Sequence, residues 1–495
     1  MTMTVAEQLR PLLDTAIQAY AGRPFEPILR DAVDRLDAPL RVAIAGRVKA
    51  GKSTLLNALV GEELAPTDAG ECTRIVTWYR DGHTYQVLME PTDGGPAVQV
   101  PFRRDNGALE VDLGDRPAAQ VARLLVDWPS QRLRNLTLID TPGIASINTE
   151  VSERAVRFLA PGDERPTQAD AVLYLLRHVH REDVRFLEAF HDDDVAHATP
   201  INAVAVLSRA DEIGVCRLDA LDSARRIAAS WRADRRLRRL VQTIVPVAGL
   251  LAQAGATLTE AEYRTLRSIA ALGAEERDDL LLTVDHVVAD HPNCAAVPEQ
   301  RRHVLQRLGL FGLRMGVQAL VEDPSTTATQ LAHAMLSASG LEELRAILAS
   351  QLASRSHVLK ARTAALTLQQ AVESDPLPGS GELANQLEAI VARDHEVAEL
   401  RLLGQLRGEQ VTLRADDLLA AERLLGTEGL AVPARLGLPA DALDQDVSEV
   451  RHVATDELAR WQRRAESPMA TKEARDAARL LVRTCEGILA DLTPA

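Results

Sequence analysis

The spacing of apolar residues along the chain changes twice. Between about Thr4 and Asp37 apolar residues recur at helical spacing, with a break near Gly22 and Pro24, and this predicts a helical N-terminal segment. From Leu40 short β-branched runs alternate with helical stretches, which is typical of an α/β sheet. The predicted strands are residues 41–45, 75–79, 85–89, 136–139, 171–176, 203–207 and 243–247.

After about Gly255 the pattern is helical to the end of the chain, with breaks at residues 324–325, 339–340 and 375–381. Apolar residues within 383–406 lie on one helical face, and those within 443–461 supply another after a Gly/Pro-rich interruption. This predicts two long antiparallel helices joined by a tip. With about 40 residues in each arm and a rise of about 1.5 Å per residue, the rod would be roughly 60 Å long.

Length, composition and net charge limit the classes of protein to which this chain can belong. A chain of 495 residues is long enough for two or three domains. The 56 Lys and Arg against 71 Asp and Glu give a net charge of −15, which argues against nucleic acid as a partner. The four Cys are too far apart for a CxxC pair, and neither a signal peptide nor a transmembrane segment is evident, so we expect a soluble, cytoplasmic protein.

The strongest chemical motif is a phosphate-binding loop between strand 41–45 and the helix predicted at 54–60. The segment 46–53, GRVKAGKS, fits GxxxxGK[ST]. We expect backbone amides of this loop to contact phosphate, Lys52 to reach the β- and γ-phosphates, and Ser53 to bind Mg²⁺. The alternative is an ordinary glycine-rich turn. The candidate residues are Gly46, Arg47, Val48, Lys49, Ala50, Gly51, Lys52, Ser53 and Thr54.

A second motif, Asp140 to Gly143 (DTPG), directly follows strand 136–139. Asp140 is expected to hold Mg²⁺ through water, and the Gly143 N–H to sense the γ-phosphate. Between the two motifs, residues 64–74 form a polar loop suited to a switch. We choose Thr73 over Thr67 as the residue that completes Mg²⁺ coordination and positions the attacking water, although either threonine could simply cap a turn.

The identity of the nucleotide base is predicted from three residues that follow strand 203–207, namely Ser208, Arg209 and Asp211. The Asp211 carboxylate can accept both guanine N1–H and N2–H, whereas adenine would leave it unpaired, so GTP is favoured over ATP. Ser208 and Arg209 replace the usual Asn or Thr and Lys, and the Arg209 side chain can still cover the ring. Ala248 and Gly249 resemble the last guanine-contacting loop, although a strand-to-helix turn explains them equally well.

Together, GRVKAGKST with LLNALVGEELAPT, ECTR, DTPG and SRAD resemble the dynamin superfamily of large GTPases, and bacterial dynamin-like proteins in particular. Length and the segment 245–255 look like the actinobacterial isoniazid-inducible dynamin-like group. The resemblance implies an α/β P-loop GTPase domain joined to an all-α elongated helical bundle or stalk. It places a G domain at 39–324, with core motifs at 40–255 and a helical extension at 256–324. Residues 1–38 and 325–495 would form the bundle.

The same resemblance implies nucleotide-driven dimerisation through the G domains and a lipid-contacting tip. We expect the tip at 424–440, exposing Leu430, Val432, Leu436 and Leu438 to the cytoplasmic membrane, where the protein would be peripherally associated. The alternative is a loop packed onto its own bundle. Lys49 stands where typical dynamins have a residue that holds a charge-compensating cation. Because relatives carry an arginine finger in this loop, we hypothesise that Lys49 stabilises the transition state.

Two functions of different classes follow. The first is a GTPase that hydrolyses GTP with Mg²⁺, assembles with itself and binds or remodels membrane. The second is a GTP-dependent module that docks a protein partner, such as a sister dynamin-like subunit, without touching lipid. A ribosome-assembly GTPase is disfavoured because no basic RNA-binding module is evident.

Overall fold

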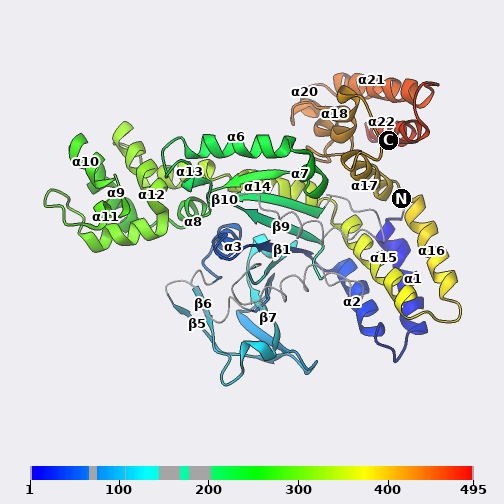
Figure 1. Cartoon of the computed structure of the whole chain (residues 1–495), viewed down its shortest axis with the longest axis horizontal. Helices are drawn as coiled ribbons and strands as arrows, with labels where there is room; N and C mark the ends of the chain where they lie inside the picture. The colour runs from blue at the N-terminus through cyan, green and yellow to red at the C-terminus, as the bar shows by residue number, and fades with distance from the viewer. Residues whose placement is uncertain (1–2, 66–74, 106–107, 144–167, 178–201, 493–495) are drawn as a thin grey trace.

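A mixed sheet with helices on both faces lies at the centre of the molecule (Figure 1). The computed structural model describes residues 3–65, 75–105, 108–143, 168–177 and 202–492. Within these ranges the main sheet has nine strands in the order β11-β10-β9-β1-β8-β2-β7-β3-β4, and β5 pairs with β6 separately. The strands are β1 (Leu40–Gly46), β2 (Thr77–Asp81), β3 (Gln86–Pro91), β4 (Val98–Gln99), β5 (Phe102–Asp105), β6 (Ala108–Val111), β7 (Val121–Trp128), β8 (Leu136–Asp140), β9 (Ala171–Leu176), β10 (Ala203–Ser208) and β11 (Ile244–Val247).

The helices divide into three groups by what they pack against. The first group packs with the main sheet and with the helices that cover it: α3 (Lys52–Val60), α6 (Ala220–Ala233), α7 (Arg235–Leu240), α8 (Gly249–Thr257), α9 (Glu260–Ala270), α10 (Ala274–Leu280), α11 (Val284–Val288), α12 (Pro298–Glu322), α13 (Ala328–Ala338), α14 (Leu341–Ile347) and a π-helix, η6 (Leu348–Ala353). The second is α1 (Val5–Ala19), α2 (Glu26–Asp37), α15 (Ser356–Ser374) and α16 (Ser380–Arg393). The third is α17 (His395–Arg407), α18 (Ala415–Leu424), α19 (Val432–Leu436), α20 (Ala442–Gln445), α21 (Val447–Ala465) and α22 (Lys472–Asp491).

Strand β1 lies between β9 and β8, and all three run parallel. Its side chains alternate between two cores: Ala43 and Ala45 face one, and Val42 and Ile44 face the other. A strand buried on both faces reads as a continuous apolar run, which is why 41–45 is recognisable in the sequence. Since parallel strands end at the same edge, this arrangement brings the segments that follow β1 and β8 together.

The expected fold class, an α/β P-loop domain plus an all-α region, is confirmed, and each of the seven predicted strands has a counterpart. Strands β4, β5, β6 and β7 were not predicted. Of these, β7 is an internal strand of the main sheet, between β2 and β3. Its sequence, VARLLVDW, mixes apolar and charged residues without strict alternation, so its period does not distinguish a strand from a helix.

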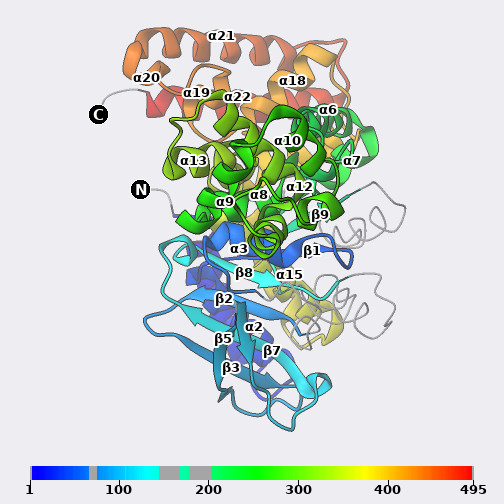
Figure 2. The same ribbon diagram turned by 90° about the vertical axis from the view of Figure 1, so that its left-hand side faces the viewer.

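The predicted pair of forty-residue antiparallel arms is wrong. The longest helix after residue 380 is α22, with 20 residues. Asp394 ends α16 and caps α17, because its side chain accepts a hydrogen bond from the Val397 N–H at 2.9 Å. Helix α16 then packs with the N-terminal helices, whereas α17 to α22 form a separate core. Figure 2 shows this last group at the opposite end of the molecule from β3 and β7.

The expected start of the bundle at residue 325 also differs from the packing. Helix α13 packs on α8, and α14 contacts α3, so both belong with the sheet. The helices that pack with α1 and α2 begin at α15. None of the helices in the described part of the chain combines the length and apolar character needed to cross a membrane.

The proposed tip residues are not exposed, which corrects the expectation for 424–440. Leu436 is 4% exposed, and Val432 and Leu438 pack against the core of α17 to α22. Leu430 is half-buried. Arg435 secures the segment, since its Nη2 donates to Glu399 Oε1 at 2.5 Å and its Nε donates to the Leu424 carbonyl at 2.6 Å. This matches the alternative of a loop packed onto its own bundle.

Candidate nucleotide-binding site

The loop from Gly46 to Lys52 has the backbone geometry that its glycines allow. Gly46 has φ +149°, and a Cβ there would lie 2.9 Å from the Leu175 carbonyl oxygen. Gly51, the N-cap of α3, has φ +93°. A side chain is disfavoured at both positions, so the glycines of the motif are required by the fold of the loop. Helix α3 begins directly after it, and a helix N-terminus suits an anion.

The Lys52 side chain points back into the phosphate-binding loop that precedes it. Its Nζ donates to the carbonyls of Gly46 at 3.2 Å and Arg47 at 3.3 Å. Burial lowers the pKa of Lys52, while the nearby Asp140 carboxylate opposes that shift. Main-chain oxygens of the candidate phosphate-binding loop therefore hold the Lys52 ammonium.

Ser53 and Asp140 face each other across the loop, as the two motifs predict. Ser53 Oγ donates to Asp140 Oδ2 at 3.3 Å. Burial raises the pKa of Asp140 to about 6, with Lys52 and Ser53 acting in the other direction. Asp140 Oδ1 is buried and has no hydrogen-bond partner in the described part of the chain. A hydroxyl and an unpaired carboxylate oxygen are hard oxygen ligands of the kind that Mg²⁺ prefers, so the donor set fits this ion.

The DTPG turn contacts the phosphate-binding loop. A Cβ on Gly143 would lie 2.5 Å from Val48 Cγ2 and 2.9 Å from Val48 Cα. Thr141 anchors the turn, because its Oγ1 donates to the Ile44 carbonyl at 2.9 Å. Thr67 and Thr73, the candidates of the switch loop, lie outside the described residues. Lys49 is exposed, with φ +64°.

A pocket connects the phosphate-binding loop with the candidate base-binding residues. Its lining includes Ala50, Gly51 and Thr54 on one side and Ser208, Arg209, Asp211 and Gly249 on the other. Residues from three separate motifs thus meet at one cavity. Ala248 lies beside it, with its N–H donating to the Ser339 carbonyl at 2.9 Å.

Asp211 is 6% exposed, and burial raises its pKa to about 6. The carboxyl is therefore mainly ionised at pH 7, as guanine recognition requires. Ser208 Oγ donates to the Leu176 carbonyl at 3.2 Å. Arg209 pairs with Glu212 at 2.6 Å in the structure, so its side chain is held by a neighbour.

Two features near the site were not predicted from the sequence. Gly309 interrupts α12 with φ +67°, and a Cβ there would lie 3.8 Å from Asp211 Oδ2. The other is Asn57 of α3, which is 1% exposed and bonds to the backbone of Leu64 and Ala65. A polar residue inside the apolar run LLNALV was the signal available for Asn57.

The comparisons with known proteins agree with this geometry. A model of the dynamin family matches residues 42–188. Isoniazid-induced protein IniC of Mycobacterium tuberculosis is 37% identical over 499 residues, covering 99% of each chain. The chain belongs to the dynamin family.

Two further similarities are weaker, one in the length matched and the other in sequence identity. Isoniazid-induced protein IniA of the same organism is 32% identical over 117 residues, covering 22% of this chain and 18% of that protein. A solved bacterial dynamin pair, described as a mechanism for the long-range sensing and tethering of membranes, aligns with 98% of this chain and 79% of that one at 13% identity and a TM-score of 0.31. The sequence expectation of a bacterial dynamin-like GTPase is confirmed by the IniC match and the family model.

Proposed function

We propose that this member of the dynamin family binds GTP together with Mg²⁺ and hydrolyses it. The observation that carries the proposal is the pocket that joins the phosphate-binding loop to the buried carboxyl of Asp211. Lys52 would contact the β- and γ-phosphates, and Asp211 would accept the guanine N–H donors. An adenine ring would leave that buried carboxylate unpaired, which is costly.

Ser53 and, through water, Asp140 would hold Mg²⁺, which when bound neutralises phosphate charge. Gly143 would direct its N–H to the γ-phosphate, and Thr73 would position the attacking water. Lys49, exposed at the surface of the loop, would compensate the charge of the transition state. If so, Lys49→Ala keeps GDP affinity and loses turnover.

Titration calorimetry with GTP, GDP and ATP in the presence of magnesium tests the proposal. We expect heat from both guanine nucleotides, no comparable heat from ATP, and loss of binding in Lys52→Ala. Lys472→Ala, in the first turn of the remote helix α22, is the matched control. Absence of binding by the wild-type chain would contradict the proposal.

We further propose that GTP binding drives self-assembly through the G domains and that the protein acts peripherally at the cytoplasmic membrane. Burial of Leu436 removes the predicted lipid-contacting tip, so the second candidate, a module that docks a protein partner such as a sister dynamin-like subunit, is kept beside it. Sedimentation with anionic liposomes, with and without GTP, separates the two. Pelleting with lipid supports membrane action; a chain that stays in the supernatant but binds a sister subunit supports the module.

A further inference from the structure

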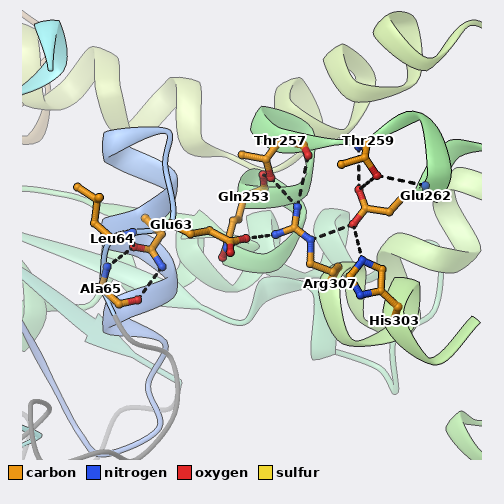
Figure 3. Close-up of polar contacts among 10 residues, drawn as sticks. Glu63, Leu64, Ala65, Gln253, Thr257, Thr259, Glu262, His303 and Arg307 are labelled. Atoms are coloured by element: carbon orange, nitrogen blue, oxygen red, sulfur yellow. Dashed lines mark hydrogen bonds and ion pairs between the residues drawn. The ribbon is translucent and has the colours of Figure 1, made fainter. Parts of the chain in front are cut away.

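Arg307 of α12 contacts three segments that are distant in the sequence (Figure 3). Its Nη1 donates to Glu63, its Nε to Glu262 Oε1 at 2.9 Å and its Nη2 to Thr257 Oγ1 at 2.6 Å. The Arg307 side chain is 19% exposed. Because a guanidinium is planar and its donors point in fixed directions, these contacts set the position of Glu63 relative to α12.

The segment from Glu63 to Ala65 is held from its other side by the phosphate-loop helix. Asn57 Oδ1 accepts from the N–H groups of Leu64 at 2.9 Å and Ala65 at 2.7 Å, and Asn57 Nδ2 donates to the Ala65 carbonyl at 3.0 Å. Figure 3 shows Leu64 and Ala65 beside α3, with the Glu63 side chain extending toward Gln253 and Arg307. The segment therefore connects α3, which begins with Lys52 and Ser53, to α12.

The two acidic partners of Arg307, Glu262 and Glu63, differ in how deeply they are buried. Glu262 is 2% exposed and also accepts from the Thr259 N–H at 2.8 Å. The pKa of Glu262 is lowered, because the opposing effect of burial is outweighed by hydrogen bonds from Thr259 and Arg307. Glu262 is thus a fixed anion that orients Arg307. The Glu63 side chain is 23% exposed, and it accepts from Gln253 Nε2 at 2.6 Å as well as from Arg307.

Helix α12 also passes close to Asp211, which lines the pocket. Gly309, two residues after Arg307, is the point at which α12 approaches Asp211. The same helix therefore lies beside Asp211 and, through Glu63 and Asn57, is connected to the helix that carries Lys52 and Ser53.

We propose that Arg307 is a positioning residue for GTP hydrolysis: through Glu63 and the segment bound by Asn57, it fixes the orientation of α3 relative to α12. The inference rests on the proposed GTPase function. Glu63 does not line the pocket, so nucleotide affinity does not depend on it directly. A small shift of α3, however, moves Ser53 relative to Asp140. Misplacement by about 1 Å is costly for the reaction rate.

The test compares steady-state GTP hydrolysis, GDP affinity and the melting temperature of variants of the full chain. Glu63→Ala is expected to lower kcat about tenfold, with GDP affinity within about twofold of wild type. The isosteric Glu63→Gln can still accept hydrogen bonds, so its kcat should be intermediate. Arg307→Lys keeps the charge beside Glu262 but not the planar fork, and its kcat should fall as in Glu63→Ala.

Glu299→Ala is the matched control. It removes the exposed ion pair with Arg302 on the same helix and should change neither kcat nor GDP affinity. Wild-type kcat in Glu63→Ala and Arg307→Lys overturns the inference. So does a loss of GDP affinity and melting temperature in step with kcat, which indicates general damage. If Glu63→Ala fails to fold, Glu63→Gln decides. A wild-type chain that does not hydrolyse GTP overturns the proposed function itself.

Discussion

Asp211 combines a recognition role with a cost to folding. Burial raises the pKa of its carboxyl from the ordinary 3.8 to about 6. Well below pH 4 the group is neutral in both the folded and the unfolded chain. Well above pH 6 it is ionised in both, and the folded chain bears the desolvation cost of the buried charge. The contribution of Asp211 to stability therefore falls as pH rises from about 4 to 6.

Asp211→Asn should make the protein more stable at pH 7.5, by an amount on the order of 3 kcal/mol at most, and leave its stability at pH 4 nearly unchanged. The same variant should lose its preference for guanine. Melting temperatures at the two pH values, together with GDP titrations, measure both effects. Glu212→Gln is the matched control, because this neighbouring carboxylate is 38% exposed. An Asp211→Asn protein that melts below wild type at pH 7.5 would contradict the argument.

At the scale of elements, the site depends on the close approach of two loops. The DTPG turn follows β8 and the phosphate-binding loop follows β1, and these strands are paired so that Ile44 lies opposite Asp140. Gly143 then meets Val48 with no room for a side chain. The turn can therefore respond to the phosphate-binding loop through direct backbone contact.

Gly143→Ala should reduce GTP turnover by roughly 10²-fold, because one of the two loops must move away from the position in which the reacting groups are aligned. Steady-state hydrolysis measures the effect. Gly487→Ala is the control: this glycine lies in α22 with open space around its Cβ position, and the substitution should be neutral or stabilise the helix by about 1 kcal/mol. Equal turnover in the two variants would show that the contact is dispensable.

At the scale of the whole molecule, the N-terminal helices join the sheet at Asp170, which directly precedes β9. Asp170 Oδ1 accepts from Arg35 Nη2 of α2 at 2.7 Å, and Asp170 Oδ2 accepts from the Arg41 N–H of β1 at 2.9 Å. Lys360 of α15 donates to the carbonyls of Leu36 at 2.7 Å and Ala38 at 3.0 Å. These contacts connect α2 and α15 to the strand that leads into the phosphate-binding loop.

Arg35→Ala should lower the free energy of unfolding by about 3 to 5 kcal/mol, because it leaves Asp170 as a buried carboxylate without its ion-pair partner. Asp170 is 2% exposed. Arg10→Ala removes an exposed ion pair with Asp37 in the same group of helices and should cost less than about 1 kcal/mol. Chemical denaturation of both variants tests this difference, and similar midpoints would refute it.

What could be predicted from sequence is the part that depends on local backbone geometry. The phosphate-binding loop and the DTPG turn are recognisable because their glycines, lysine and carboxylate must occupy fixed positions between a strand and a helix. The buried strands are recognisable from their apolar runs. Strand β7 was missed because its partners β2 and β3, not its own residue pattern, make it a strand.

Tertiary structure alone decided which surfaces the amphipathic segments cover. An apolar face has the same pattern whether it meets lipid, another chain or its own core, so the sequence could not place Leu436 in the core of α17 to α22. Nor could it pair Glu63 with Arg307, 244 residues away. Local conformation is determined by each segment's own residues, whereas burial and long-range ion pairs arise only when distant segments compete for the same neighbours.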